Sequence, residues 1–227
     1  MKEPNAPQKI KNPAKKPLVF IVLAIAFTII VKFVDVRPVT LENSPVGLAS
    51  LNESVRSLFS FNEQGINPTW DKVTDLAAAA LFAVAGFFVI LGFVQLIRRK
   101  SFKKVDRELK FLALVYLATG AVYLFFEKIL IVNYRPILMD GVLEASYPSS
   151  HALFALVLAG SAILLVKNYL KPKSATLISL VLALLALVVT FGRLLAGVHW
   201  FTDVVGSVFI SAALVSAFAA TLHYKKF

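Results

Sequence analysis

Three short segments of the sequence place histidine, acidic and basic side chains among apolar neighbours. They read KILIVNYRP (128–136), YPSSHALFAL (147–156) and GRLLAGVHWFTDV (192–204). An ionisable side chain placed in hydrocarbon costs about 2.5–3.5 kcal/mol on membrane-insertion scales, so such residues usually have a function or a partner. Each segment is therefore a candidate for chemistry.

The third segment holds a histidine and an aspartate four residues apart. If both belong to the start of one helix, His199 and Asp203 share a face of it. Asp203 would then accept a hydrogen bond from one ring nitrogen, fix the tautomer and leave the other nitrogen free as a nucleophile, as in a catalytic triad. The alternative is a purely structural His–Asp pair, which the spacing alone slightly favours.

The second segment has the features of a helix start. Pro148 suits that position, Ser149 or Ser150 can cap the helix, and the free N–H groups of the first turn form a natural site for an anion. His151 would lie beside this site. Taken alone, the segment favours an ordinary capped helix with a hydrogen-bonded histidine.

The first segment carries two cations. Lys128 and Arg135 are seven residues apart, or two helical turns, so a continuous helix directs both to one face, about 10 Å apart along its axis. Alternatively, Lys128 pairs with Glu127 and Arg135 only marks a membrane interface. The segment alone favours neither interpretation.

The composition predicts that membrane helices position these residues. Of 227 residues, 58% are hydrophobic and 16% charged, and the mean hydropathy is +0.77, well above that of a soluble domain. Six stretches are long and apolar enough to span a bilayer, namely 18–34, 76–97, 111–134, 150–166, 174–192 and 204–222. We therefore predict an all-α, polytopic membrane protein built as a six-helix bundle. The chain has no cysteine, which excludes disulfides and cysteine-ligated metal sites.

Lysine and arginine cluster in the first 16 residues, in 98–110, in 167–173 and at 225–226. Short basic segments stay in the cytoplasm, and six crossings place all four on that side. We therefore predict cytoplasmic termini, a basic tail at 1–17 and a six-helix domain at 18–227. The start resembles a signal peptide without a cleavage site, which favours an uncleaved anchor. Segment 35–75 is predicted to be extracytoplasmic and to contain a short amphipathic helix in SLNESVRSLFSF (50–61).

This topology delivers all three segments to the same extracytoplasmic face, although it was derived from the linkers alone. Two histidines, a carboxylate, three cations and a helix start that converge at one interface form a site for a phosphate group. The cations would neutralise its non-bridging oxygens.

These residues resemble the motifs of the type 2 phosphatidic acid phosphatase family of integral membrane lipid phosphatases, which shares its site with vanadium haloperoxidases. The family motifs are Lys, six residues and Arg-Pro; Pro-Ser-Gly-His; and Ser-Arg, five residues, His, three residues and Asp. The chain matches them in order with Lys128, Arg135, Pro136, Pro148, Ser149, His151, Arg193, His199 and Asp203. It departs at Ser150, where the family has glycine, and at Gly192, where the family has serine and so a hydroxyl near the phosphate.

The resemblance implies a role for each matching residue. His199 attacks phosphorus to form a phosphohistidine, Asp203 orients its ring, and His151 protonates the leaving oxygen and later activates water. The phosphoryl oxygens would be held by Lys128, Arg135, Ser149, Arg193 and the backbone at Ser150. No metal or other cofactor is implied. Because one histidine must be neutral and the other protonated, the rate should have a bell-shaped pH dependence.

The implied substrate is a lipid phosphate whose tails stay in the bilayer. Candidates are undecaprenyl pyrophosphate, phosphatidylglycerol phosphate and phosphatidic acid. A nucleic-acid partner is not expected, because the net charge of +11 lies in clusters between apolar runs. The competing interpretation is a non-enzymatic, anion-binding membrane transporter, although the sequence shows neither inverted repeats nor charges deep within helices.

Overall fold

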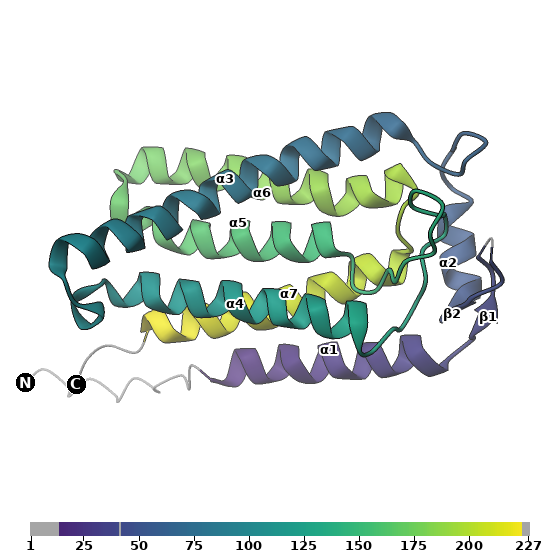
Figure 1. Cartoon of the computed structure of the whole chain (residues 1–227), viewed down its shortest axis with the longest axis horizontal. Coiled ribbons are helices and arrows are strands. Elements are labelled where there is room, and N and C mark those ends of the chain that lie inside the picture. The colour runs from purple at the N-terminus through teal and green to yellow at the C-terminus, as the bar shows by residue number, and fades with distance from the viewer. Residues whose placement is uncertain (1–13, 41, 224–227) are drawn as a thin grey trace, which may run out of the picture.

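The computed structural model describes residues 14–40 and 42–223, and in these ranges six long helices form one bundle (Figure 1). They are α1 (Lys15–Phe33), α3 (Pro68–Arg99), α4 (Arg107–Lys128), α5 (Ser150–Tyr169), α6 (Pro172–Ala196) and α7 (Phe201–His223). Each is long and apolar enough to cross a bilayer, which confirms the predicted all-α membrane bundle. The shorter elements are β1 (Arg37–Pro38), β2 (Pro45–Val46), α2 (Ala49–Arg56) and the 3₁₀ turn η1 (Phe102–Lys104).

Helix α3 begins well before the predicted apolar span. The side chain of Asn67 caps it by accepting a hydrogen bond from the N–H of Trp70 (3.3 Å), and Pro68 occupies the first helical position. The added residues, 68–75, include Asp71 and Asp75, which therefore belong to α3.

Helix α4 ends at Lys128, so the predicted continuation to residue 134 is wrong. The following residues include β-branched Ile131, which loses side-chain freedom in a helix. Their backbone groups are also used elsewhere, because Lys32 of α1 donates a hydrogen bond to the carbonyl of Ile131 (2.6 Å). Lys128 and Arg135 consequently do not share a helix face.

Helix α5 lies in the middle of the bundle (Figure 1). In the most apolar 18-residue stretch of α5, 56% of the residues are buried inside the protein. The corresponding share in α1 is 11%. It packs against α6 and α7, whereas α1 lies at the periphery along α7. The central helix is therefore the one that begins at the candidate phosphate site.

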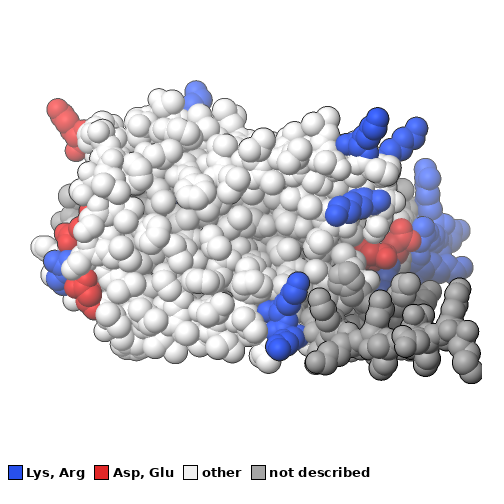
Figure 2. Space-filling model, turned by 180° about the vertical axis from the view of Figure 1, so that it is seen from behind, with Lys and Arg blue, Asp and Glu red and all other residues white. Residues whose placement is uncertain are grey.

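The outer surface of the bundle is apolar along its length. Figure 2 shows a wide uncharged band, with the charged side chains towards the two ends. Exposed side chains such as Ile25, Phe93, Leu117 and Leu184 lie on four different helices of this band. A surface of this kind requires lipid around it, so the protein is a multi-pass membrane protein.

We call the end of the bundle that carries α2 the α2 end, and the opposite end the terminal end, because α1 begins and α7 finishes there (Figure 1). Lysine and arginine gather at the terminal end (Figure 2). Among the basic residues predicted at the two termini, Lys15 and Lys16 lie at this end. The others lie outside the described residues, namely Lys2, Lys9, Lys11, Lys225 and Lys226. Helix α1 begins at Lys15, inside the tail predicted at 1–17.

The short helix predicted near residues 50–61 is α2, at 49–56. Its inward face carries Ala49 and Asn52, whereas Leu51 and the nearby Leu58 are exposed. Leu51 and Leu58 thus point away from the protein, whereas Val55 and Phe59 line a small hollow beside His199.

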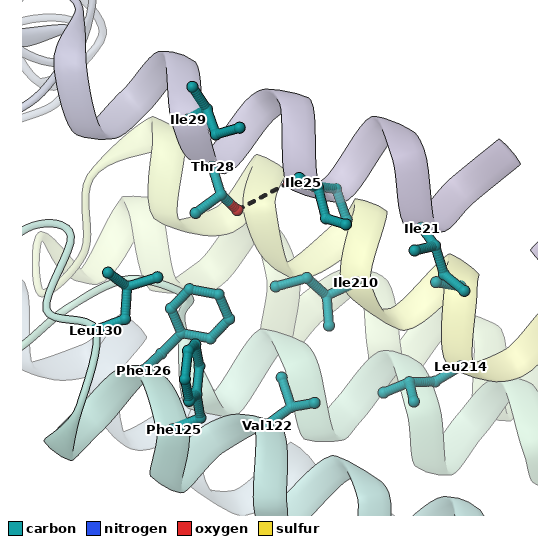
Figure 3. Close-up of a pocket in the computed structure, with 12 residues that line it drawn as sticks. Ile21, Ile25, Thr28, Ile29, Val122, Phe125, Phe126, Leu130, Ile210 and Leu214 are labelled. Atoms are coloured by element: carbon teal, nitrogen blue, oxygen red, sulfur yellow. Dashed lines mark hydrogen bonds between the residues drawn. The ribbon is translucent and has the colours of Figure 1, made fainter. Parts of the chain in front are cut away.

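An apolar groove of about 360 Å³ runs between α1 and α4, with α7 as its floor (Figure 3). Ile25, Phe126 and Ile210 line it from these three helices. Near Leu130, the hydroxyl of Thr28 bonds to that of Tyr147 (2.8 Å).

Candidate active site

The three motif segments meet at the α2 end. Helix α5 begins there at Ser150, α6 ends at Ala196, and the turn 197–200 leads into α7 at Phe201. Segment 129–149 passes beside this turn and bonds to it. The chain topology predicted from the charged linkers therefore brings the motifs to one end of the molecule.

The turn 197–200 is fixed by side chains from two other segments. Gly197 ends α6 with φ of 79°, a conformation that glycine adopts without strain. Arg56 of α2 donates a hydrogen bond to the carbonyl of Gly197 (2.6 Å), and Arg135 donates to the carbonyl of Val198 (3.2 Å). The histidine that follows is consequently held at a defined position.

His199 lies beside Asp203, but not in the geometry predicted. His199 precedes α7, and Asp203 belongs to its first turn, so the two do not share a helix face. Asp203 Oδ2 accepts the N–H of Trp200 (2.9 Å), as the third residue of a helix does in a capping box. The same oxygen is 3.5 Å from His199 Nδ1, which makes no hydrogen bond to the described residues. Helix capping therefore produces the His–Asp pair.

A buried polar network that sequence analysis missed holds the other side of Asp203. Asn133 Nδ2 donates to Asp203 Oδ1 (3.0 Å) and to the hydroxyl of Thr202 (3.1 Å). Asn52 of α2 donates to the same hydroxyl (2.9 Å) and accepts the N–H of Thr202 (3.1 Å). Isolated polar residues far apart in sequence carry no spacing signal, so no pattern indicated them.

Arg135 contacts the nitrogen of His199 that faces away from Asp203. Its NH1 group lies 3.2 Å from His199 Nε2, and its Nε group donates to Glu144 Oε2 at 3.0 Å. Because arginine only donates, Nε2 must present its lone pair. The neutral ring therefore carries its hydrogen on Nδ1, on the side of Asp203, and the free lone pair is on Nε2.

His199 lies in the turn between two spanning helices and is almost completely buried. Burial lowers its pKa well below the ordinary range of histidine. The positive charges of Arg135, Arg193 and His151 act in the same direction. This shift favours the neutral ring, which is the form that can act as a nucleophile.

Helix α5 presents its first turn to the same region. Ser149 occupies the N-cap position, but neither its hydroxyl nor that of Ser150 caps the helix, contrary to expectation. The N–H groups of the first turn are thus without a side-chain cap and suit an anion. His151 lies in that turn, and its Nε2 is 3.2 Å from Asp75 Oδ1 of α3.

Arg193, near the end of α6, is buried and held by α3. Its NH1 group donates to Asp71 Oδ1 (2.9 Å) and to the hydroxyl of Thr74 (3.0 Å), with Asp75 Oδ1 at 3.4 Å. Sequence analysis missed these three residues. Two acidic residues four apart at the start of an apolar span were a usable signal for Asp71 and Asp75.

Lys128 is not brought into this cluster. Its side chain is 70% exposed, and its Nζ is 3.4 Å from Glu127 Oε1. Of the two arrangements that the sequence left open for this lysine, the structure has the pair with Glu127.

Several buried polar atoms of the site have no hydrogen-bond partner among the described residues. They include Ser149 Oγ, His151 Nδ1 and Arg193 Nε. Each unpaired buried group costs about 1–3 kcal/mol, so their concentration at one end of the bundle indicates a site for a polar ligand.

The arrangement suits a phosphate-sized anion. Two buried arginines and a helix start supply positive potential, a neutral imidazole supplies a nucleophile, and a second histidine can transfer protons. Within the described ranges, no group of three or more His, Cys, Asp or Glu residues is placed to hold a metal ion.

Comparisons with known proteins give the fold and the family of the chain. Among solved structures, the chain is similar to one described as the first transmembrane PAP2 type phosphatidylglycerolphosphate phosphatase from Bacillus subtilis, with 19% identity and a TM-score of 0.57. The alignment covers 95% of this chain and 98% of that one, and at this identity the likeness concerns the fold. No curated protein matches the chain. The family model described as the PAP2 superfamily matches residues 108–227, more than half of the chain and all three motif segments. The chain therefore belongs to the PAP2 superfamily.

Proposed function

We propose that the protein is a membrane phosphatase that hydrolyses a lipid phosphomonoester or pyrophosphate through a phosphohistidine, without a metal cofactor. The observation that carries this proposal is the orientation of His199, with Nδ1 beside Asp203 and the Nε2 lone pair facing Arg135. Membership of the PAP2 superfamily supports the reaction class.

In the first step, His199 Nε2 attacks phosphorus, and the bond from phosphorus to the leaving oxygen breaks. His151 gives its proton to that oxygen. The phosphorylated ring is positively charged, and Asp203 stabilises it through Nδ1–H. Arg135 NH1 donates to Nε2, so this group must transfer to a phosphoryl oxygen before attack.

In the second step, water attacks the phosphohistidine. His151, now neutral, takes a proton from the water, the phosphorus–nitrogen bond breaks and inorganic phosphate leaves. Arg135, Arg193, Ser149 and the first-turn backbone at Ser150 would bind the phosphoryl oxygens in both steps.

The position of His151 supports its role as the general acid. It lies at the same end of the bundle as His199, and its charge acts on the pKa of His199, which requires proximity. Asp75 Oδ1 lies 3.2 Å from Nε2 of His151, so this carboxylate can hold the ring in place by a hydrogen bond.

The substrate is proposed to be a lipid because the site lies at the ends of helices whose outer surface is lipid-facing. A headgroup phosphate reaches such a site while the tails remain in the bilayer. Phosphatidylglycerol phosphate, phosphatidic acid and undecaprenyl pyrophosphate meet this requirement. The solved structure from Bacillus subtilis carries the name of a phosphatidylglycerolphosphate phosphatase, which supports the first of them.

The α2 end is proposed to face the extracytoplasmic side. Lysine and arginine gather at the opposite, terminal end (Figure 2), and basic segments stay in the cytoplasm. Both termini would then be cytoplasmic.

The proposal is tested with detergent-purified protein and a panel of the three lipid phosphates, each with and without a chelator. Release of phosphate should resist the chelator and be abolished by His199→Ala. Equal release by the wild type and this variant would refute the proposed nucleophile. Binding of lipid phosphates without any release would favour a non-enzymatic anion-binding protein.

A further inference from the structure

Gly192, the residue that departs from the serine of the family motif, lies directly against Thr74 of α3. A Cβ atom built on Gly192 would lie 2.3 Å from Thr74 Cγ2, closer than any stable contact. Thr74 is completely buried. A serine at position 192 therefore cannot coexist with Thr74 in its present place.

Thr74 also places its hydroxyl beside Arg193, the residue that follows Gly192. Its Oγ1 accepts a hydrogen bond from Arg193 NH1 (3.0 Å) and donates one to the carbonyl of Asp71 (2.8 Å). The second bond fixes the lone pairs of the hydroxyl towards the guanidinium. A threonine hydroxyl bonded to the preceding turn of its own helix is a stable rotamer.

We propose that Thr74 replaces the missing serine hydroxyl of the motif and acts as a positioning residue for Arg193. Gly192 provides the space that this substitution requires. The guanidinium is planar, so anchoring NH1 to α3 sets the direction in which the unpartnered Nε points. The phosphate site would thus include a residue of α3, outside the region 108–227 that the family model covers.

This inference rests on the proposed phosphate chemistry of Arg193 and deepens it. It distinguishes Thr74 from an ordinary packing residue, because packing depends on the methyl group and positioning depends on the hydroxyl. Substitutions that remove one and keep the other separate the two roles.

The decisive variant is Thr74→Val, which keeps the shape against Gly192 and removes the hydroxyl. We expect kcat/KM for lipid phosphate to fall roughly 10- to 100-fold, the usual effect of losing a hydrogen bond to a charged group. Thr74→Ser, which keeps the hydroxyl, should retain most activity. The matched control is Thr190→Val, since the hydroxyl of Thr190 is buried in α6 and donates only to the carbonyl of Ala186 (2.7 Å) in its own helix.

A second measurement does not depend on hydrolysis. Inorganic phosphate should raise the melting temperature of the wild type, and Thr74→Val should weaken this effect while Thr190→Val does not. If the wild type binds inorganic phosphate but releases none from any lipid, the proposed function fails. The rise in melting temperature with phosphate would still test the role of Thr74. If Thr74→Val equals Thr190→Val in both assays, the inference is overturned.

The steric part of the proposal is that Gly192 leaves room for Thr74. It is tested by exchanging the side chains at positions 74 and 192. Gly192→Ser alone should lower the melting temperature and the activity, because the new side chain meets the methyl group of Thr74. Adding Thr74→Ala removes that methyl group and restores a motif serine beside Arg193. The double variant should exceed either single variant in activity, whereas simple addition of the two losses would contradict the exchange.

Discussion

Arg135 donates to the nitrogen of His199 that attacks phosphorus in the proposed mechanism, with 3.2 Å between the two atoms. The contact protects the lone pair from protonation and orients it. It also places a guanidinium beside the proposed nucleophile, so that in the proposed mechanism the same residue would bind the phosphoryl oxygens of the substrate.

The first prediction concerns this contact. Arg135→Lys keeps the charge but cannot bond to Glu144, Val198 and His199 together, because a lysine lacks the planar fork of arginine. We expect kcat to fall roughly 10²- to 10³-fold, the usual effect of removing one donor of a preorganised anion site. Steady-state kinetics on the best lipid substrate measure it, and unchanged kcat would show that the contact has no catalytic role.

The second prediction concerns Asp203. In Asp203→Asn the amide can donate towards His199 Nδ1, which favours the tautomer with hydrogen on Nε2 and removes the nucleophilic lone pair. We expect a loss on the order of 10⁴-fold in kcat, as for the equivalent change in serine proteases. A phosphohistidine that survives alkali and is lost in acid should be trapped from the wild type during turnover and be undetectable in this variant. Normal labelling of Asp203→Asn would contradict the assignment.

The third prediction is the pH dependence. Because burial and Arg135 lower the pKa of His199, the acidic limb of kcat/KM should lie below the ordinary histidine value of about 6.5. The alkaline limb should report loss of the proton from His151, which gives a bell-shaped profile. A flat profile through the histidine range would exclude the two-histidine mechanism.

The same pKa shift makes the stability of the protein depend on pH. The measured pH–rate profile must therefore be separated from unfolding of the protein at low pH. The pKa of His199 is lower in the folded than in the unfolded protein, so its contribution to the free energy of unfolding is complete above about pH 6.5 and is lost as the pH falls towards the folded-state value. Melting temperatures across the pH range, for the wild type and His199→Gln, separate titration of the active site from acid unfolding.

The fourth prediction concerns Lys128. Since this side chain is exposed and pairs with Glu127, Lys128→Ala should cost less than about 10-fold in kcat/KM, as expected for a surface ion pair. Arg193→Ala, which removes a buried cation, should cost far more. Equal losses in the two variants would show that Lys128 moves into the phosphate site when substrate binds.

The bundle and the grouping of its motifs could be predicted from the sequence because both depend on simple patterns. The apolar spans fix the number of helices, and the basic linkers fix which loops share an end. Together they were enough to place His151, Arg193 and His199 at one end of the molecule.

Other parts of the site depend on tertiary contacts that no local pattern encodes. Segment 129–149, which follows the end of α4, bonds to α1 at Ile131 and Tyr147, and hydropathy does not reveal such contacts. The His199–Asp203 pair was predicted for a wrong reason, because spacing alone does not distinguish a helical face from a helix cap. Thr74 and Asn133 became visible only when α3 and the turn 197–200 were placed in space.

The peripheral α1 packs along α7, so the first spanning helix of the chain finds its neighbour in the last. During synthesis, α1 enters the bilayer while that neighbour is still untranslated, and it waits there for most of the polypeptide to emerge. The same late helix carries Asp203. Packing of α1 and formation of the proposed catalytic pair therefore both require α7, and a chain truncated before α7 would lack both.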